Sequence, residues 1–461
     1  MINEAKISEI VESVIRNMNT VSGKKQLGVF DTMAEALAAV DKAYKQYRSY
    51  SVEQREKMIS AIRRLTLEEA EQMAVLGVKE TGMGRVVDKT IKHQLVANKT
   101  PGTEDLQPRV YTGDDGMTLI EMAPFGVIGS ITPSTNPSET VICNSIGMIA
   151  GGNAVVFNPH PNACEVANYA VDLVNRAILE AGGPENLVVS VKKPTHESSN
   201  EMMQSPIVKM LVATGGPGVV KALLSSGKKA IGAGAGNPPV IVDDTADIAK
   251  AGRDIVNGAS FDNNLPCIAE KECFAFDNIT DELILSMISA GAYLIKGDQI
   301  EQLKKVCLVE KDGKFSINKK WVGKDAKLFL KEIGIDADPK LIICETDENH
   351  PFVQVEMMMP ILAIVRVKDI DQAIEMAVKA EHGNRHSAHI HSKNVDHLTR
   401  FAKAVETTIF VKNAPSYAGI GAGGEGHTTF TIAGPTGEGL TCTRSFTRQR
   451  RCVLVDGLHI V

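Results

Sequence analysis

Short apolar runs alternate with amphipathic segments along most of this chain. Between Phe125 and Val242 the apolar runs fall near 126–131, 154–157, 187–191, 209–213 and 239–242, and the segments between them have the spacing of apolar residues typical of helices. Residues 243 to about 435 repeat this alternation. The pattern predicts two α/β units, each with a mostly parallel sheet and with ligand-binding loops at the strand ends.

The pattern differs before residue 125. From Asp31 it is helical for about fifty residues. Asp31 and Ser51 are suitable N-cap residues, and Gly82 and Gly84 are suitable for ending the last of these helices. Residues 111–122 instead alternate around Gly113-Asp114-Asp115-Gly116, which predicts a β-hairpin.

The N-terminal segment, residues 1–18, carries an apolar stripe at helical spacing, formed by Ile7, Ile10, Val11, Val14, Ile15 and Met18. The acidic residues interspersed with this stripe argue against a signal peptide. Residues 19–28 predict a polar, glycine-containing linker. An isolated helix this short is marginal in water, so the stripe packs either on the globular body or on a partner.

Composition narrows the class of protein. The 461 residues are enough for two or three domains, and 43% hydrophobic with 23% charged residues is ordinary for a soluble protein. A net charge of −6 gives no electrostatic basis for nucleic acid binding, and no apolar run is long enough to cross a membrane. The eight cysteines include no Cys-x-x-Cys pair, which fits a reducing compartment and argues against structural zinc or a disulfide framework.

The stretch 258–271 places one thiol, Cys267, after a polar, turn-prone run that ends in Pro266. Such a run can hold a side chain at the rim of a cleft, which makes Cys267 a candidate nucleophile. The alternative is a small buried hydrophobic residue, the commoner situation for a free cysteine.

Three further stretches fit chemistry at a carbonyl group. Asn136 stands between two prolines after the apolar run 125–131, where its amide can donate to an oxyanion or simply form a turn. The turn Thr214-Gly215-Gly216-Pro217-Gly218 precedes a helical pattern, so its amides can approach a phosphate, although glycine also makes ordinary turns. The small residues of 228–242 indicate backbone that lines a pocket or makes a tight crossover.

Three histidines, His386, His389 and His391, raise the question of a metal site. His389 and His391 share one face of the expected strand, but His386 points to the other, and no cysteine or acidic partner falls at ligand spacing. We therefore expect no metal. His386 is a candidate acid or base, because imidazole can take the proton of an attacking thiol, or else a surface loop residue.

The order and spacing of Asn136, the glycine turn 215–218, Cys267 and the segment 356–360 resemble the aldehyde dehydrogenase superfamily. Residues 28–461 resemble in particular the coenzyme A-acylating propionaldehyde and acetaldehyde dehydrogenases of bacterial microcompartments, with long similar strings at 133–137, 228–239, 258–271 and 420–426. The resemblance implies an aldehyde dehydrogenase-like α/β fold of two Rossmann-like parallel-sheet domains plus a small β oligomerisation element.

The same resemblance divides the chain. It implies an NAD-binding domain at 29–108 and 124–242, a catalytic domain that carries the thiol at 243–435, and an oligomerisation element at 109–123 and 444–461. For 444–461, the residues alone also fit a solvated basic edge strand. Similarity to encapsulation peptides implies that residues 1–18 dock onto shell proteins, which places the enzyme in the lumen of a cytoplasmic microcompartment.

The resemblance also implies roles for single residues. Cys267 is the nucleophile, Asn136 is the oxyanion donor, and His386 matches a histidine of the acylating relatives. The residues expected to bind the cofactor are Thr132, Ser134, Thr214, Gly215, Gly216, Gly218, Gly234 and Glu356. Without the resemblance, Glu356 reads as a solvated helix residue and Met357–Met359 as core filling.

One departure from the hydrolytic members concerns the acyl acceptor. Those enzymes activate water with a glutamate at the start of a Glu-Leu-Gly-Gly-Lys motif, and an ungapped reading places Ala233 there. Without that base, the acyl-enzyme is expected to react with a thiol, which favours coenzyme A. Asn158 and Pro161 stand where the family has a ribose-binding lysine and glutamate, so NAD versus NADP stays open.

The expected activity is reversible oxidation of propionaldehyde, or a similar short aldehyde, by NAD and coenzyme A to propionyl-CoA and NADH through a cysteine thioester. Leu265-Pro266 favours the propionaldehyde enzymes over the acetaldehyde ones. The alternatives are an acetylating acetaldehyde dehydrogenase, a hydrolytic aldehyde dehydrogenase, and a catalytically silent shell adaptor. The expected assembly is a homo-oligomer, either a dimer or a tetramer.

Overall fold

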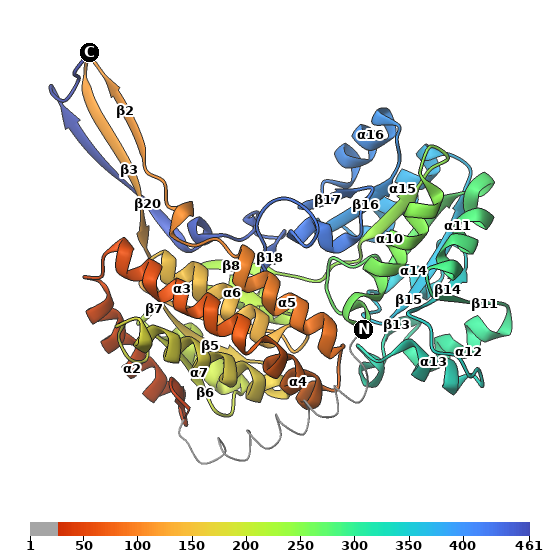
Figure 1. Cartoon of the computed structure of the whole chain (residues 1–461), viewed down its shortest axis with the longest axis horizontal. Helices are drawn as coiled ribbons and strands as arrows, with labels where there is room; N and C mark the ends of the chain where they lie inside the picture. The colour runs from red at the N-terminus through yellow and green to blue at the C-terminus, as the bar shows by residue number, and fades with distance from the viewer. Residues whose placement is uncertain (1–25) are drawn as a thin grey trace.

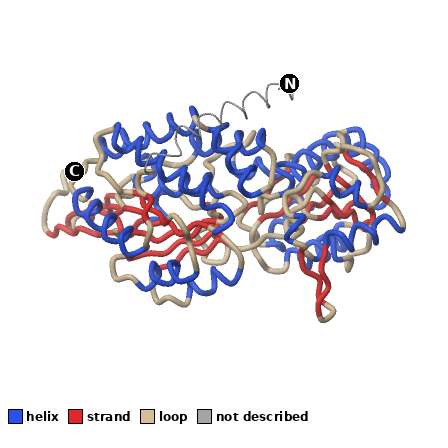
Figure 2. The backbone as a smooth tube through the Cα atoms, turned by 90° about the horizontal axis from the view of Figure 1, so that it is seen from below, coloured by secondary structure: helices blue, strands red, loops and turns tan. Residues whose placement is uncertain are grey.

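The computed structural model describes residues 26–461, so the predicted helix at 1–18 and most of the predicted linker lie outside the described residues. Two lobes stand side by side, and a long three-stranded arm projects from the first (Figure 1). Each lobe is built on a parallel sheet with helices on both faces (Figure 2). The predicted α/β class with two parallel sheets is confirmed. Among the described helices, none is both long and apolar enough to cross a bilayer.

The first lobe contains a six-stranded parallel sheet in the order β1-β6-β5-β4-β7-β8. Its strands are β1 (Val29–Phe30), β4 (Val127–Thr132), β5 (Ala154–Pro159), β6 (Val188–Val191), β7 (Val208–Thr214) and β8 (Lys229–Ala233). Its helices are α2 (Met33–Tyr47), α3 (Val52–Glu68), α4 (Ala70–Thr81), α5 (Val86–Lys99), α6 (Pro137–Ala150), α7 (Cys164–Glu180), α8 (His196–Gln204) and α9 (Pro217–Leu224).

Helices α2 and α3 begin at residues whose side chains cap the helix N-terminus. Ser51 caps α3 as predicted, because its hydroxyl accepts from the N–H of Gln54 while the Gln54 side chain accepts from the N–H of Ser51. The prediction for Asp31 is wrong, since Thr32 caps α2. Thr32 has Glu35 three residues later and forms the reciprocal capping box with it. Gly82 ends α4 in the left-handed conformation, as predicted.

The second lobe contains a seven-stranded parallel sheet in the order β11-β14-β15-β10-β9-β16-β17. Its strands are β9 (Pro239–Val242), β10 (Glu272–Phe276), β11 (Ala292–Ile295), β14 (Leu341–Glu345), β15 (Ile361–Val367), β16 (Ser387–His391) and β17 (Ile409–Lys412). Its helices are α10 (Ile248–Ser260), α11 (Asp277–Ser289), α12 (Asp298–Cys307), α13 (Ala326–Glu332), α14 (Pro351–Gln354), α15 (Ile370–Glu381) and α16 (Val395–Val405), with a small hairpin of β12 (Leu308–Lys311) and β13 (Lys314–Ile317).

The predicted boundary between the two domains, after residue 242, is wrong. Strand β9 lies inside the second sheet, between β10 and β16, so the chain changes lobe before Pro239. A short apolar run fits the centre of either sheet, which is why its pattern did not decide between them.

The far end of the predicted 243–435 domain differs as well. After β17 the chain returns to the first lobe, where Ile420, Phe430 and Ile432 join the core of the first sheet. The short strand β18 (Ile432–Ala433), paired with β19 (Gly439–Leu440), lies beside β8. The second sheet is therefore inserted between two parts of the first lobe.

The arm is an antiparallel sheet of β2 (Arg109–Gly113), β3 (Gly116–Pro124) and β20 (Thr447–Val455). Strands β2 and β3 form the predicted hairpin with Asp114-Asp115 at its turn, and β20 pairs along the whole of β3. Apolar side chains of this arm lie in solvent, among them Val110, Tyr111, Val453 and Val455. Its oligomerisation role stays a prediction.

Candidate active site

A cleft of about 380 Å³ lies where the two lobes meet. The first lobe contributes the ends of β4 and β7 with the turns that follow them, and the second contributes the segment around Cys267 and the loop after α14. Eight of the predicted site residues line this cleft: Ser134, Asn136, Thr214, Gly215, Gly216, Gly234, Cys267 and Glu356. The fold thus gathers residues that are far apart in the sequence.

The thiol is presented by an unusual backbone segment. After α10, three consecutive residues have positive φ values: Asp262 at 47°, Asn263 at 55° and Asn264 at 64°. Aspartate and asparagine tolerate this left-handed region better than other residues with a Cβ atom. The amide of Asn263 donates to the carbonyl of Gly323 at 2.9 Å, and the amide of Asn264 donates to the carbonyl of Ala259 at 2.8 Å. These bonds hold the sharp turn that carries Cys267 to the cleft.

The surroundings of Cys267 keep its proton in place. Cys267 is half-buried and lines the cleft. Burial raises the pKa of its thiol to about 12, and the charge of Glu356 acts in the same direction. Lys271 opposes this shift, and its ammonium group donates to the carbonyl and the side-chain oxygen of Asn264 at 2.9 and 2.6 Å. Cys267 is therefore a thiol near neutral pH, and only its deprotonated form would be a strong nucleophile.

Asn136 stands at the N-cap position of α6, directly before Pro137, yet its side chain does not cap the helix. Its oxygen accepts a hydrogen bond from the ammonium group of Lys92, and its amide nitrogen donates to the Thr135 hydroxyl at 3.3 Å. The amide lies in the wall of the cleft that also contains Cys267. This placement fits an oxyanion donor better than an ordinary turn asparagine.

A buried group of charges supports both segments. The Lys92 ammonium lies 2.6 Å from an Asp262 oxygen and 3.1 Å from a Glu139 oxygen, and the Lys89 ammonium lies 3.2 Å from the same Asp262 oxygen. Burial disfavours charge on Lys92, but Asp262 and Glu139 outweigh it and raise the pKa. Burial acts against the Glu139 carboxylate too, yet Lys92 and Lys89 lower its pKa to about 2. Burial instead lowers the pKa of Lys89, although the charge of Asp262 opposes this shift, so Lys92 is the more firmly charged of the two lysines.

Sequence reasoning missed this group. Lys89, Lys92 and Val96 share the buried face of α5, so a lysine pair at core positions of an amphipathic helix was the available signal. The partners could not be found in the same way, because Asp262 is brought to α5 only by the meeting of the two lobes.

The predicted phosphate turn follows β7, and Gly216 is the N-cap residue of α9. A Cβ atom added at Gly215, Gly216 or Gly218 would meet no other atom within 4 Å. The backbone is therefore open to a ligand at a helix N-terminus, and these residues fit the phosphates of a dinucleotide. Gly218 does not line the cleft itself.

Glu356 follows the end of α14, so the reading as a solvated helix residue is wrong. Glu356 lines the cleft. Burial raises the pKa of Glu356, while Lys271 and the main-chain N–H of Gly236 act in the opposite direction. A carboxylate in this wall fits the hydroxyl groups of a ribose.

Two predicted site residues lie behind the cleft wall. Thr132 is buried at the end of β4, and its hydroxyl has no hydrogen-bond partner among the described residues. His386 is only 1% exposed, so the alternative of a surface loop histidine is wrong. A Cβ atom on Gly236 would lie 2.9 Å from Cγ of His386 and 2.8 Å from the carbonyl oxygen of Cys267, which shows how closely the histidine packs behind the thiol segment.

The buried histidines are neutral near neutral pH. Burial, followed by the charge of Lys271, lowers the pKa of His386 to about 4, and its Nδ1 shares a hydrogen bond with the Ser387 hydroxyl at 2.8 Å. His389 instead bonds through Nε2 to the carbonyl of Ile268 at 2.9 Å, which supports the segment after Cys267. Within residues 26–461, no three histidine, cysteine or acidic side chains gather in a metal-binding cluster.

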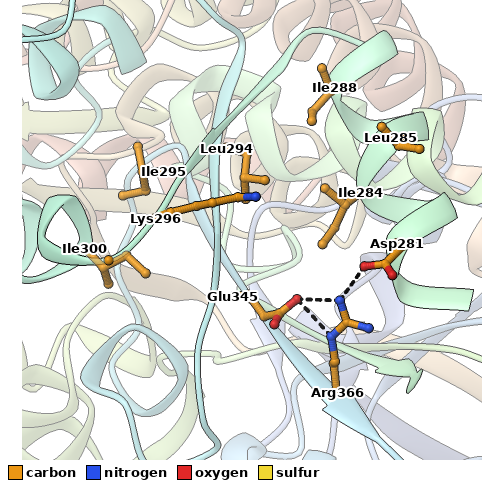
Figure 3. A pocket seen from close by; sticks show the side chains of 11 residues that line it. Asp281, Ile284, Leu285, Ile288, Leu294, Ile295, Lys296, Ile300, Glu345 and Arg366 are labelled. Carbon is orange, nitrogen blue, oxygen red and sulfur yellow. Dashed lines mark hydrogen bonds and ion pairs between the residues drawn. The ribbon is translucent and has the colours of Figure 1, made fainter. Parts of the chain in front are cut away.

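A second hollow, of about 590 Å³, lies in the second lobe between α11, β11 and the ends of β14 and β15 (Figure 3). Its walls are the apolar side chains of Ile284, Leu285 and Ile288, together with Arg366. Arg366 is held by Asp281 at 2.5 Å and by Glu345 at 2.9 Å. The hollow contains none of the predicted site residues, so we place the chemistry in the first cleft.

Two parallel α/β lobes with a cysteine and a side-chain amide in the cleft between them fit a class of enzymes that attack carbonyl groups with a thiol. The sequence profile of the aldehyde dehydrogenase family matches residues 3–435, and the chain belongs to that family. The resemblance inferred from the motifs is thereby confirmed.

Within this family, the chain is similar to proteins named as acylating aldehyde dehydrogenases. The chain is 46% identical over 468 residues to the acetaldehyde dehydrogenase (acetylating) EutE of Salmonella typhimurium, covering 100% of both chains. It is 44% identical to the propanal dehydrogenase (CoA-propanoylating) of the same organism, covering 99% of this chain and 100% of the relative. The structure of a propionaldehyde dehydrogenase from the fucose utilisation microcompartment of Clostridium phytofermentans matches with a TM-score of 0.92 and 57% identity, over 95% of this chain and 100% of that one.

Proposed function

We propose that this protein is a coenzyme A-acylating aldehyde dehydrogenase that converts propionaldehyde, or a similarly short aldehyde, to its acyl-CoA with NAD as oxidant. The observation that carries the proposal is the shared cleft of Cys267 and Asn136, in a chain whose close relatives bear acylating names. The same cleft disfavours a silent shell adaptor, because a scaffold does not need a thiol and an amide donor together.

The first half-reaction forms a thioester on Cys267. The Sγ atom releases its proton to solvent in the cleft and bonds to the aldehyde carbon, while Asn136 and the main-chain N–H of Cys267 donate to the oxygen that becomes negative. A bound nicotinamide cofactor supplies the acceptor for the aldehyde hydride. Glu356 is the residue proposed to position that cofactor by its ribose, and the turn at 214–218 is proposed to hold its phosphates.

The second half-reaction releases the acyl group. The coenzyme A thiol attacks the thioester carbon, Asn136 again holds the oxyanion, and the sulfur of Cys267 leaves. Ala233 ends β8 directly before Gly234 of the cleft wall, so a methyl group stands where the hydrolytic members of the family carry the water-activating glutamate. This disfavours a hydrolytic enzyme. His386 packs behind the Cys267 segment, and its Nε2 atom has no hydrogen-bond partner among the described residues, so it is our candidate for taking the proton of the coenzyme A thiol.

The walls of the cleft include apolar residues on both sides of Cys267 in the chain and others far from it, namely Leu265, Pro266, Ile268, Met358 and Phe430. Such a wall accepts a short alkyl chain but discriminates weakly, because one methylene is worth about 1–3 kcal/mol in a hydrophobic pocket. We propose propionaldehyde as the preferred substrate and acetaldehyde as the second candidate. The relatives include enzymes named for both.

The proposed assembly is a homo-oligomer formed through the arm, in the lumen of a bacterial microcompartment. The exposed apolar residues of β2 and β20 support the first part. The origin of a similar structure in a microcompartment supports the second. Docking to shell proteins is assigned to residues 1–18, so deleting them is expected to leave turnover intact and abolish encapsulation.

The experiment is NADH formation by the purified protein with propionaldehyde and NAD, with and without coenzyme A, beside Cys267→Ala. We expect a steady rise in absorbance only with coenzyme A, accumulation of propionyl-CoA, and an inactive variant. Equal turnover without coenzyme A, with propionate as product, would show that water is activated and would overturn the acylating reading. Repeating the assay with acetaldehyde and with NADP ranks the two aldehydes and the two cofactors.

A further inference from the structure

The ammonium group of Lys92 lies beneath the cleft, with no exposed surface. It donates three hydrogen bonds or ion pairs: to the side-chain oxygen of Asn136, to Asp262 at 2.6 Å, and to Glu139 at 3.1 Å. Lys92 comes from α5 of the first lobe, whereas Asp262 belongs to the turn that carries Cys267 from the second. One cation thus touches both the amide and the thiol segment.

This contact decides which way the Asn136 amide faces. An ammonium group can only donate, so the atom next to it must be the amide oxygen. The amide nitrogen then points away from Lys92, donates one hydrogen to Thr135, and has the other available to the cleft. The reversed amide would set two donors against each other in a buried place and direct an acceptor at the oxyanion, which would repel it.

The charge on Lys92 also strengthens the donor. A cation bonded to an amide oxygen draws electron density from the nitrogen, and linked hydrogen bonds polarise one another. Asp262 and Glu139 keep the Lys92 ammonium charged despite its burial. The orientation and the polarisation of the amide therefore depend on the same buried cation.

We propose that Lys92 is a positioning residue of this enzyme: it fixes and polarises the Asn136 amide so that its nitrogen donates to the oxyanion in both half-reactions. The proposal rests on the function proposed above. Lys92 does not line the cleft, so it acts through Asn136.

Lys89 provides a matched comparison on the same helix. It is also buried, at 3% exposed, and it bonds to the same Asp262 oxygen and to the carbonyl of Thr135. Among the described residues, the Asn136 side chain forms hydrogen bonds with Lys92 and Thr135 and none with the side chain of Lys89. Replacing either lysine removes one buried cation next to Asp262, but only replacing Lys92 frees the amide.

The test is a double-mutant cycle on turnover with saturating propionaldehyde, NAD and coenzyme A, using Lys92→Met, Lys89→Met and Asn136→Ala. Loss of an oxyanion donor costs about 10²- to 10³-fold in kcat, so we expect that fall for Asn136→Ala and a fall of at least about tenfold for Lys92→Met. The Lys92→Met/Asn136→Ala variant should be no more than about twofold slower than Asn136→Ala alone, because its amide is already gone. Any loss from Lys89→Met should multiply with that of Asn136→Ala.

Two results would overturn the proposal: a kcat of Lys92→Met within about twofold of the parent enzyme, or losses that multiply in the Lys92 cycle as they do in the Lys89 cycle. The rate at which iodoacetamide alkylates Cys267 distinguishes an effect of the mutation on the thiol from an effect on the Asn136 amide. The charge of Lys92 also lowers the pKa of the Cys267 thiol, though less than the charge of Lys271 does, so the alkylation rate should fall much less than kcat in Lys92→Met. A fall parallel to kcat would assign the effect of Lys92 to the thiol segment instead.

Folding of the variants is checked by thermal melting. If Lys92→Met does not fold, Lys92→Met/Glu139→Gln removes one charge of each sign and enters the same cycle, with Glu139→Gln as its parent. Failure of the proposed function itself is distinguishable, because the unaltered enzyme would then form no acyl-CoA.

Discussion

A Cβ atom on Gly84 would lie 2.2 Å from Oδ1 of Asp262, although the two residues belong to different lobes. The same Asp262 oxygen accepts from the main-chain N–H of Arg85 at 2.8 Å. The glycine, with a φ of +79°, therefore gives the thiol segment the room to approach the first lobe.

Replacing this glycine should damage the active site from a distance. Gly84→Ala requires both an unfavourable φ and displacement of Asp262, so we expect a loss of stability of about 1–3 kcal/mol and a marked fall in turnover. Gly82→Ala is the matched control. It also has a positive φ, at +65°, but its Cβ would meet only the flexible end of Lys324, so it should lose stability and keep its kcat. Thermal melting and the NADH assay separate the two, and equal kcat losses would contradict this account.

The reactivity of Cys267 should depend steeply on pH. Because burial raises the pKa of its thiol to about 12, the reactive thiolate fraction should grow about tenfold per pH unit from pH 6 to 9. The rate of alkylation by iodoacetamide, followed by mass spectrometry of the peptide that contains Cys267, measures this dependence. Exposed Cys452 is followed in the same digest as an internal comparison. A plateau of the Cys267 rate below pH 8 would show a stabilised thiolate and contradict the prediction.

Stability should depend on pH through Glu270. Its carboxyl accepts from the N–H of Ser416 at 2.9 Å, but burial raises its pKa from 4.5 to about 7. A raised pKa in the folded state means that the folded protein binds the proton more tightly, so this stabilisation is complete below pH 4.5 and is lost as the pH rises through 7.

Glu270→Gln removes that titration. The variant should gain stability relative to the parent as the pH rises from 5 to 8, by up to about 3 kcal/mol in the free energy of unfolding. Urea unfolding at several pH values measures the difference. The exposed replacement Glu310→Gln is the control, and a Glu270→Gln curve parallel to that of the parent at all pH values would refute the assignment.

The arm should govern assembly. Val453 and Val455 are 58% and 64% exposed on β20, and neighbouring exposed apolar side chains on one face of a strand are typical of an interface. Replacing both with lysine should shift the sedimentation profile from oligomer towards monomer with the fold retained. Gln449→Lys, on the same strand, should leave the profile unchanged. An unaltered mass for the double variant would remove the arm from the interface.

Local patterns accounted for much of this structure. The apolar runs located the strands from β4 to β7, and the turn residues located the hairpin of the arm, because both depend on neighbours in the sequence. Pro239–Val242 was recognised as a strand, but its sheet depends on pairing with distant strands, which no local pattern contains.

The residues of the candidate active site also fall into two groups, those that sequence motifs predicted and those that only the fold brings together. Cys267, Asn136 and Glu356 belong to motifs, so they were predicted, and the fold does bring them into one cleft. Lys92 and Asp262 were not, since they are far apart in the chain and meet only where two lobes touch. His386 was foreseen as a candidate, but its burial came from the packing of Gly236 against it.

The insertion of the second sheet within the first lobe has a consequence for biosynthesis. The core of the first lobe includes Phe430, Ile432 and Phe446, which a ribosome makes only after every strand of the second sheet. During translation, part of the apolar core of the first lobe therefore stays exposed until the last segment is made. The second lobe can already fold by then. A nascent chain stalled before β18 should be a good ligand for chaperones, and release of the last segment should end that binding.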